Sequence, residues 1–169
     1  MNWRKNSLDH IERRLGIACF GRSEISMDYI DLTISNLHNI CEECGNYGTT
    51  NCVKAQCNVG FSITMMEYKK KSKNPILNDG ISMIPNEDTK YYDTKKIARG
   101  IASICKACKE CNDGHSEFCP ISLARKSIEG TILKDLEAYP GNVLAYLVNV
   151  GKQNPDIANL IMEEFKNLE

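Results

Sequence analysis

The sequence lacks long hydrophobic runs. No stretch of its 169 residues approaches the roughly 18 consecutive apolar residues that a membrane-spanning helix needs. The first residues, Met1 to Arg14, are polar and carry charges of both signs, so they also lack the apolar core of a signal peptide. We therefore expect a cytoplasmic protein with no membrane partner.

A surplus of charge of either sign is also missing. The chain has 21 Lys and Arg residues against 22 Asp and Glu residues, for a net charge of −1. General nucleic-acid binders usually carry a clear basic surplus, so a nucleic-acid partner is not expected. Signatures of common enzymes are absent too: there is no G-x-G-x-x-G, P-loop, H-E-x-x-H or G-x-S-x-G motif. These absences favour a non-enzymatic role, although they do not decide whether the protein is an enzyme.

Cysteine, in contrast, is abundant, with nine residues in the chain. The cytoplasm keeps thiols reduced and disfavours disulfides, so metal binding is the general explanation for so many cysteines there. Cys19 lies in an apolar patch, Leu15 to Phe20, where we expect a buried small hydrophobic residue. The other eight cysteines fall into two groups of four.

The second group carries the more distinctive spacing. Cys105, Cys108 and Cys111 form C-x2-C-x2-C, and Cys119 follows after seven residues with Pro120 behind it. This spacing lets three thiolates wrap around three corners of a cubane cluster. The run resembles the cysteine motif of bacterial-type [4Fe-4S] ferredoxins, which also ends in Cys-Pro but has a last gap of three residues. The resemblance covers only these 16 residues and implies that the four cysteines hold a [4Fe-4S] cluster.

The first group consists of Cys41, Cys44, Cys52 and Cys57. Four thiolates within 17 residues can hold either a cluster or a tetrahedral zinc ion. Zinc sites usually pair two C-x2-C motifs across a dozen or more residues. The second group fits this pattern poorly, whereas the spacing of the first group is compatible with zinc or with a cluster. We expect two [4Fe-4S] clusters, with two zinc ions as the alternative.

One histidine stands inside the second group. His115 lies between Cys111 and Cys119, where it could replace a cysteine ligand, donate a hydrogen bond to a cluster sulfur, or simply face solvent. Positive charge near this group favours thiolates, and Arg99, Lys106 and Lys109 are the flanking candidates.

Apolar residues recur at helical spacing in six segments, which predicts a mainly α fold without a substantial sheet. The segments begin near Ser26, Asn51, Asp93, Pro120, Asn142 and Asn154. The stretch from Lys69 to Thr89 breaks the pattern with prolines and glycine and predicts a loop. Within it, Ile81 to Ile84 could form a short extended piece.

The chain therefore divides into two halves. Residues 1–72 form an N-terminal helical half with the first cysteine group, residues 73–92 a connecting loop, and residues 93–169 a C-terminal half with the second group. Each half reads as a helix, a C-x2-C pair, a polar loop and another helix. We expect two similar metal-bearing units, followed by C-terminal helices, within one compact domain.

The leading hypothesis is an iron–sulfur protein with two clusters. It would act in electron transfer, or as a cluster-bearing accessory or subunit of a larger redox system, with a redox protein or enzyme complex as partner. A zinc-stabilised adaptor or regulatory protein is one alternative. A second is an enzyme whose cluster has an open site, for which the first group is the candidate. On one continuous helix Cys52 and Cys57 would diverge by roughly 140°, so one of them must occupy an irregular turn.

Overall fold

Within the residues that this computed structural model describes, 28–72, 75–111 and 115–168, the regular elements are all helices. The predicted mainly α fold without a sheet is confirmed for this part of the chain. The positions predicted as the first helix cap, Ser26, and as a buried thiol, Cys19, lie outside the described residues. The elements are α2 (Tyr29–Cys41), η1 (Lys54–Gln56), α3 (Asn58–Lys71), η2 (Gly80–Met83), α4 (Thr94–Lys109), α5 (Pro120–Glu129), α6 (Val143–Gln153) and α7 (Pro155–Asn167), where η marks a 3-10 helix.

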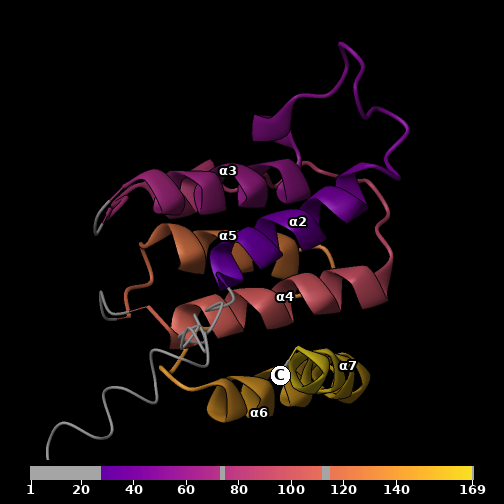
Figure 1. The fold of residues 1–169 in the computed structure, drawn as a ribbon. Helices are drawn as coiled ribbons and strands as arrows, with labels where there is room; N and C mark the ends of the chain where they lie inside the picture. Colours follow the sequence, from indigo (N-terminus) through magenta and orange to yellow (C-terminus); the bar gives the residue numbers. More distant parts are fainter. Residues whose placement is uncertain (1–27, 73–74, 112–114, 169) are drawn as a thin grey trace, which may run out of the picture.

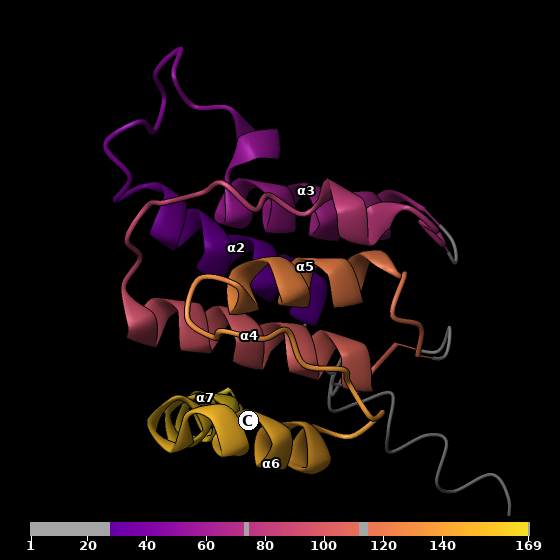
Figure 2. The same cartoon turned by 180° about the vertical axis from the view of Figure 1, so that it is seen from behind.

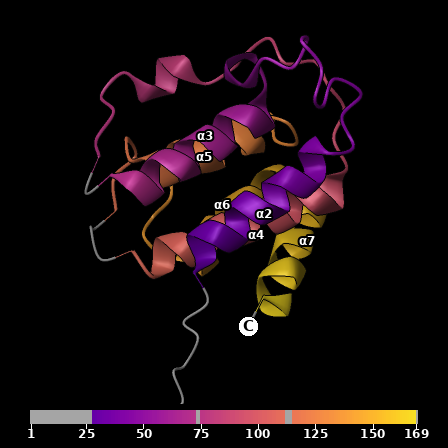
Figure 3. The same ribbon diagram turned by 45° about the horizontal axis from the view of Figure 1, so that its top comes forward.

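Four helices form the body of the molecule. Helix α2 packs against α4 and α3 packs against α5, while α2–α3 and α4–α5 contacts join the two pairs (Figure 1, Figure 3). Helices α6 and α7 pack on each other, and α7 covers the side of α4 away from the α3–α5 pair. The view from behind shows α5 between α3 and α4 (Figure 2).

The four helices comprise two helix–cysteine loop–helix units, α2–α3 and α4–α5, as the sequence predicted. The units meet at equivalent positions. Ser62, five residues after Cys57, donates a 2.8 Å hydrogen bond to the carbonyl oxygen of Ala124, five residues after Cys119. The loop after α2, with the first cysteine group, lies on the right of Figure 1, and the end of α4 and the start of α5, with cysteines of the second group, lie on its left. The two groups are therefore at opposite ends of the bundle.

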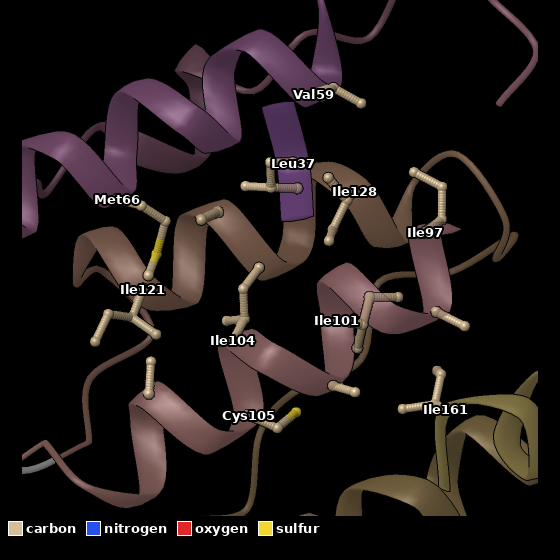
Figure 4. Close-up of a cluster of buried hydrophobic side chains, with 14 of the residues drawn as sticks. Leu37, Val59, Met66, Ile97, Ile101, Ile104, Cys105, Ile121, Ile128 and Ile161 are labelled. Atoms are coloured by element: carbon tan, nitrogen blue, oxygen red, sulfur yellow. The ribbon is translucent and has the colours of Figure 1, made fainter. Parts of the chain in front are cut away.

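The core lies between these helices and α7. Leu37, Ile101, Ile104, Ile128 and Ile161 are fully buried (Figure 4). Burying a side chain of this kind stabilises the fold by roughly 1.5–3 kcal/mol. Helix α5 is the most central element, because each of its ten residues is buried. Among the described helices, none has the length and apolar character needed to cross a bilayer.

Three predicted helix starts have the expected caps. The side chains of Asp93, Asn142 and Asn154 accept hydrogen bonds from backbone N–H groups in the first turns of α4, α6 and α7. Such caps typically contribute about 1 kcal/mol each. Pro120 and Pro155 occupy first-turn positions, where the missing N–H costs no helical hydrogen bond.

The prediction of a helix beginning at Asn51 is wrong, because α3 begins seven residues later at Asn58. Residues 51–57 instead form a turn and η1, which leaves Ala55 outside the helix. The segment from Ile81 to Ile84 is predicted as extended. Its first three residues instead belong to the 3-10 helix η2, and only Ile84 has an extended backbone. Ile132 is at helical spacing from Ile128, which favours a longer helix from Pro120, but α5 ends before it, at Glu129.

Candidate metal centres

The first group of cysteines surrounds one cavity. Cys41 ends α2, and the backbone N–H of Cys44 donates a 3.0 Å bond to the carbonyl of Cys41 in the turn that follows. Cys52 lies in a turn in which its backbone N–H donates a hydrogen bond to the carbonyl of Thr49, and Cys57 directly precedes α3. All four line a cavity of about 690 Å³, which we call the first centre. The structure thus brings together every predicted residue of this group.

Cys57 is the N-cap of α3. The backbone N–H of Gly60 donates a 3.4 Å hydrogen bond to its Sγ atom, as it would to a capping serine or aspartate. The helix N-terminus favours negative charge at this sulfur. Because Cys57 precedes the helix and Cys52 precedes η1, the two side chains are free of the divergence that one continuous helix would impose.

Residues of the connecting loop complete the first centre. Tyr92 Oη lies 3.3 Å from Cys57 Sγ and donates a 2.7 Å bond to Asp88 Oδ2. Asp88 has a fully buried side chain, accepts a 2.8 Å bond from the N–H of Asn58 and pairs with Lys90 Nζ at 3.0 Å. Burial alone would raise the pKa of Asp88, but its bonds to Tyr92, Asn58 and Lys90 hold the pKa below its usual range. A charged carboxylate therefore fixes the loop beside Cys57.

The four sulfurs of the first centre lie close enough to repel one another when ionised. Burial raises the pKa of Cys41, and negative charge on Cys57, Cys52 and Cys44 raises it further. Lys54 opposes this rise. Such mutual repulsion between thiolates is relieved by a bound cation.

Gly60 permits the close approach of η1 to α3. A Cβ atom there would lie 2.8 Å from Cα and 2.9 Å from the carbonyl oxygen of Lys54, both backbone atoms that cannot rotate away. Gly60→Ala should therefore displace η1 and destabilise the fold by roughly 1–3 kcal/mol. Thermal unfolding tests this.

Gly151→Ala is the matched control. It also lies within a helix, but its added Cβ would make an ordinary contact with Ala158 Cβ at 3.6 Å. Alanine favours helix over glycine, so this variant should be as stable as the wild type or more so. Equal behaviour of the two variants would contradict the packing argument.

The second group of cysteines gathers around the end of α4 and the start of α5. Cys105 and Cys108 belong to α4, and the N–H of Cys111 donates a 3.2 Å bond to the carbonyl of Cys108. Cys119 is the N-cap of α5 and accepts a 3.4 Å bond from the N–H of Ser122. We call this the second centre. Part of it is a cavity of about 520 Å³ lined by Cys108, Lys109, Cys111, His115, Tyr139 and residues 141–144 at the start of α6.

The cysteines of the second centre differ in their surroundings. Burial, then negative charge on Cys119 and Cys111, raises the pKa of Cys108 to about 11. Cys105 is 1% exposed, and burial raises its pKa while Arg125 opposes the rise. Negative charge on the Cys108 thiolate also raises the pKa of Cys105. Cys108 therefore lies among the other sulfurs, whereas Cys105 extends toward the core.

A cation that the sequence pattern does not reveal lies near Cys105. Buried Arg125 forms an ion pair with buried Glu129, donates a 3.0 Å bond to the carbonyl of Glu137 and lies over the ring of Tyr146. Of the predicted cations, Arg99 instead pairs with Glu164 at 3.1 Å, and the amine of Lys106 lies over the ring of Phe165.

His115 is held by a chain of polar contacts. Its Nδ1 atom lies 3.9 Å from Cys108 Sγ, and its Nε2 atom lies 3.0 Å from Glu117 Oε1. Lys126 Nζ lies 2.6 Å from Glu117 Oε2, and the N–H of Tyr139 donates a 3.1 Å bond to Oε1. Burial would raise the pKa of Glu117, but Lys126, His115 and this backbone bond lower it to about 2. Glu117 is therefore an anion that fixes the histidine ring.

All four cysteines of the first group line its cavity, whereas Cys108 and Cys111 are the cysteines that line the cavity of the second centre. In the described ranges, no three His, Cys, Asp or Glu side chains converge closely enough to bind one metal ion. All eight cysteines described are free of disulfides. No protein family, curated protein or solved structure matches this chain.

Proposed function

We propose that this is an iron–sulfur protein with two [4Fe-4S] clusters, one at each end of the helical bundle. It acts in electron transfer, or as a cluster-bearing accessory or subunit of a larger redox system in the cytoplasm. The main support is that the four cysteines of the first group line one cavity and that each group ends in a cysteine that caps a helix. The candidate ligands are Cys41, Cys44, Cys52 and Cys57 at the first centre, and Cys105, Cys108, Cys111 and Cys119 at the second.

Both centres provide donors suited to an anionic cluster. The N–H groups of Gly60 and Ser122 donate to Cys57 and Cys119, and hydrogen bonds to coordinating sulfurs are among the features that set cluster potentials. Among the described residues, the buried hydroxyl of Ser122 has no hydrogen-bond partner.

The size of the first cavity suits a cluster. Around one zinc ion, thiolates at about 2.3 Å from the metal lie about 3.8 Å from one another in a closed tetrahedron. Here four cysteines line a cavity of about 690 Å³, which leaves room for an inorganic core with a metal at each corner.

The position of the two centres suits a protein that connects two partners. Tyr92, which contacts Cys57, directly precedes the N-cap of α4, and Cys108 lies in the last turn of this 16-residue helix. A helix of that length spans about 24 Å. Two partners that dock at opposite ends of the bundle would not compete for the same surface.

Metal and sulfide analysis of protein purified without oxygen tests this proposal. We expect brown protein with about eight iron and eight acid-labile sulfide per chain. Colourless protein with about two zinc and no sulfide would overturn the proposal and favour the structural adaptor. About four iron would overturn the two-cluster form and leave a single cluster.

A further inference from the structure

The second centre has five candidate ligands for four cluster corners. Cys105 is the least suited of them. It is buried among core side chains on α4 near Ile101 and Ile104, as Figure 4 shows. Its counterpart Cys41, the first cysteine of the other C-x2-C pair, lines the cavity of the first centre. The cavity of the second centre is lined instead by Cys108, Cys111 and His115.

His115 has the surroundings of a metal ligand. Metal-binding histidines almost always donate their second ring N–H to a carboxylate, carbonyl or water, which fixes the ring and the tautomer. Glu117 occupies that place at Nε2, and it is itself fixed by Lys126 and by the N–H of Tyr139. The ring also packs on Tyr139, with 5.2 Å between centroids. This leaves Nδ1 directed toward Cys108 and the cavity.

We propose that His115 Nδ1, in place of Cys105, is the fourth ligand of the second cluster, which is then held by Cys108, Cys111, Cys119 and His115. The inference rests on the proposed function. Nδ1 and Cys108 Sγ, now 3.9 Å apart, must separate to reach two corners of a cluster, and both lie on the wall of the 520 Å³ cavity.

A neutral imidazole gives the second cluster one less negative charge than four thiolates would. Histidine ligation raises the reduction potential of iron–sulfur centres. The His115 ligand therefore raises the reduction potential of the second cluster above the value that four thiolates would give it.

The ligand set is tested on the complete chain, purified without oxygen. Cys105→Ala, and Cys105→Val as a variant that fills the core, should keep about eight iron, whereas His115→Ala should fall to about four. His115→Cys should restore the iron and lower the potential of the second cluster. In protein labelled with ¹⁵N-histidine, pulsed EPR of the reduced wild type should show a directly bound histidine nitrogen that is lost in His115→Ala.

Loss of half the iron in both Cys105 variants, with no histidine coupling in the wild type, would overturn the inference in favour of four cysteines. A coupling that persists in His115→Ala would assign the ligand to another histidine and overturn it as well. A wild type without iron and sulfide would overturn the proposed function itself, so the two failures are distinguishable.

Discussion

Replacing Cys57 with serine should remove the first cluster and leave the second. Iron should fall from about eight to about four per chain, with sulfide falling in parallel. Serine is a preferred N-cap, so α3 should keep its first turn while the site loses a thiolate. Loss of metal can then be assigned to the missing ligand and not to a melted helix. Iron and sulfide analysis, with circular dichroism of the same sample, measures both.

Cys119→Ser is the matched control, because Cys119 caps α5 as Cys57 caps α3. It should remove the second cluster and keep the first. If both variants lose the same cluster, ligands cross between the two groups and the assignment by group is wrong. If Cys57→Ser keeps eight iron but loses a ligand-binding or redox property, the first cluster has an open site and the enzyme hypothesis gains support.

The sequence identified the cysteine groups and most helices because these depend on local signals. Asp93, Asn142 and Asn154 are common capping residues, and each caps its helix as expected. Cysteine is not a usual capping residue. The sequence therefore does not reveal Cys57 as the cap of α3 and predicts a start near Asn51 instead.

Other features could not be predicted because they depend on tertiary contacts. Asp88 and Tyr92 lie more than 30 residues from Cys57 in the chain, and only the path of the connecting loop brings them together. The helical spacing of Ile121, Ala124 and Ile128 predicts a helix with one buried face, yet α5 is buried on all sides. That central position encloses Arg125 and Glu129, which a periodic pattern assigns to solvent.

Replacing Arg125 with methionine should destabilise the protein by about 3–5 kcal/mol, the usual cost of leaving a buried charge without its partner. The side chains of Arg125 and Glu129 are 3% and 0% exposed, so water cannot replace the lost ion pair. The variant also loses the bond to the carbonyl of Glu137 and the contact with Tyr146. Denaturant unfolding of the metal-loaded protein measures the change.

Lys70→Met is the control for the loss of an ion pair as such. Lys70 pairs with Asp31 at 2.5 Å, but both side chains are about half exposed. Pairs of this kind contribute little, since water and salt screen them, so no measurable loss of stability is expected. Equal effects of the two substitutions would show that burial does not govern the strength of the Arg125–Glu129 pair.

The loss in Arg125→Met should depend on pH. Burial raises the pKa of Glu129, and Arg125 opposes this rise, so its removal raises the pKa further. Between the pKa of an unfolded glutamate and this higher value, the folded state binds more protons than the unfolded state, and stability falls as the pH rises. The variant should therefore recover part of its stability on acidification relative to the wild type. Arg125→Met/Glu129→Gln, which has no carboxylate to protonate, should lack this recovery, and a recovery in the double variant would assign the pH dependence to another group.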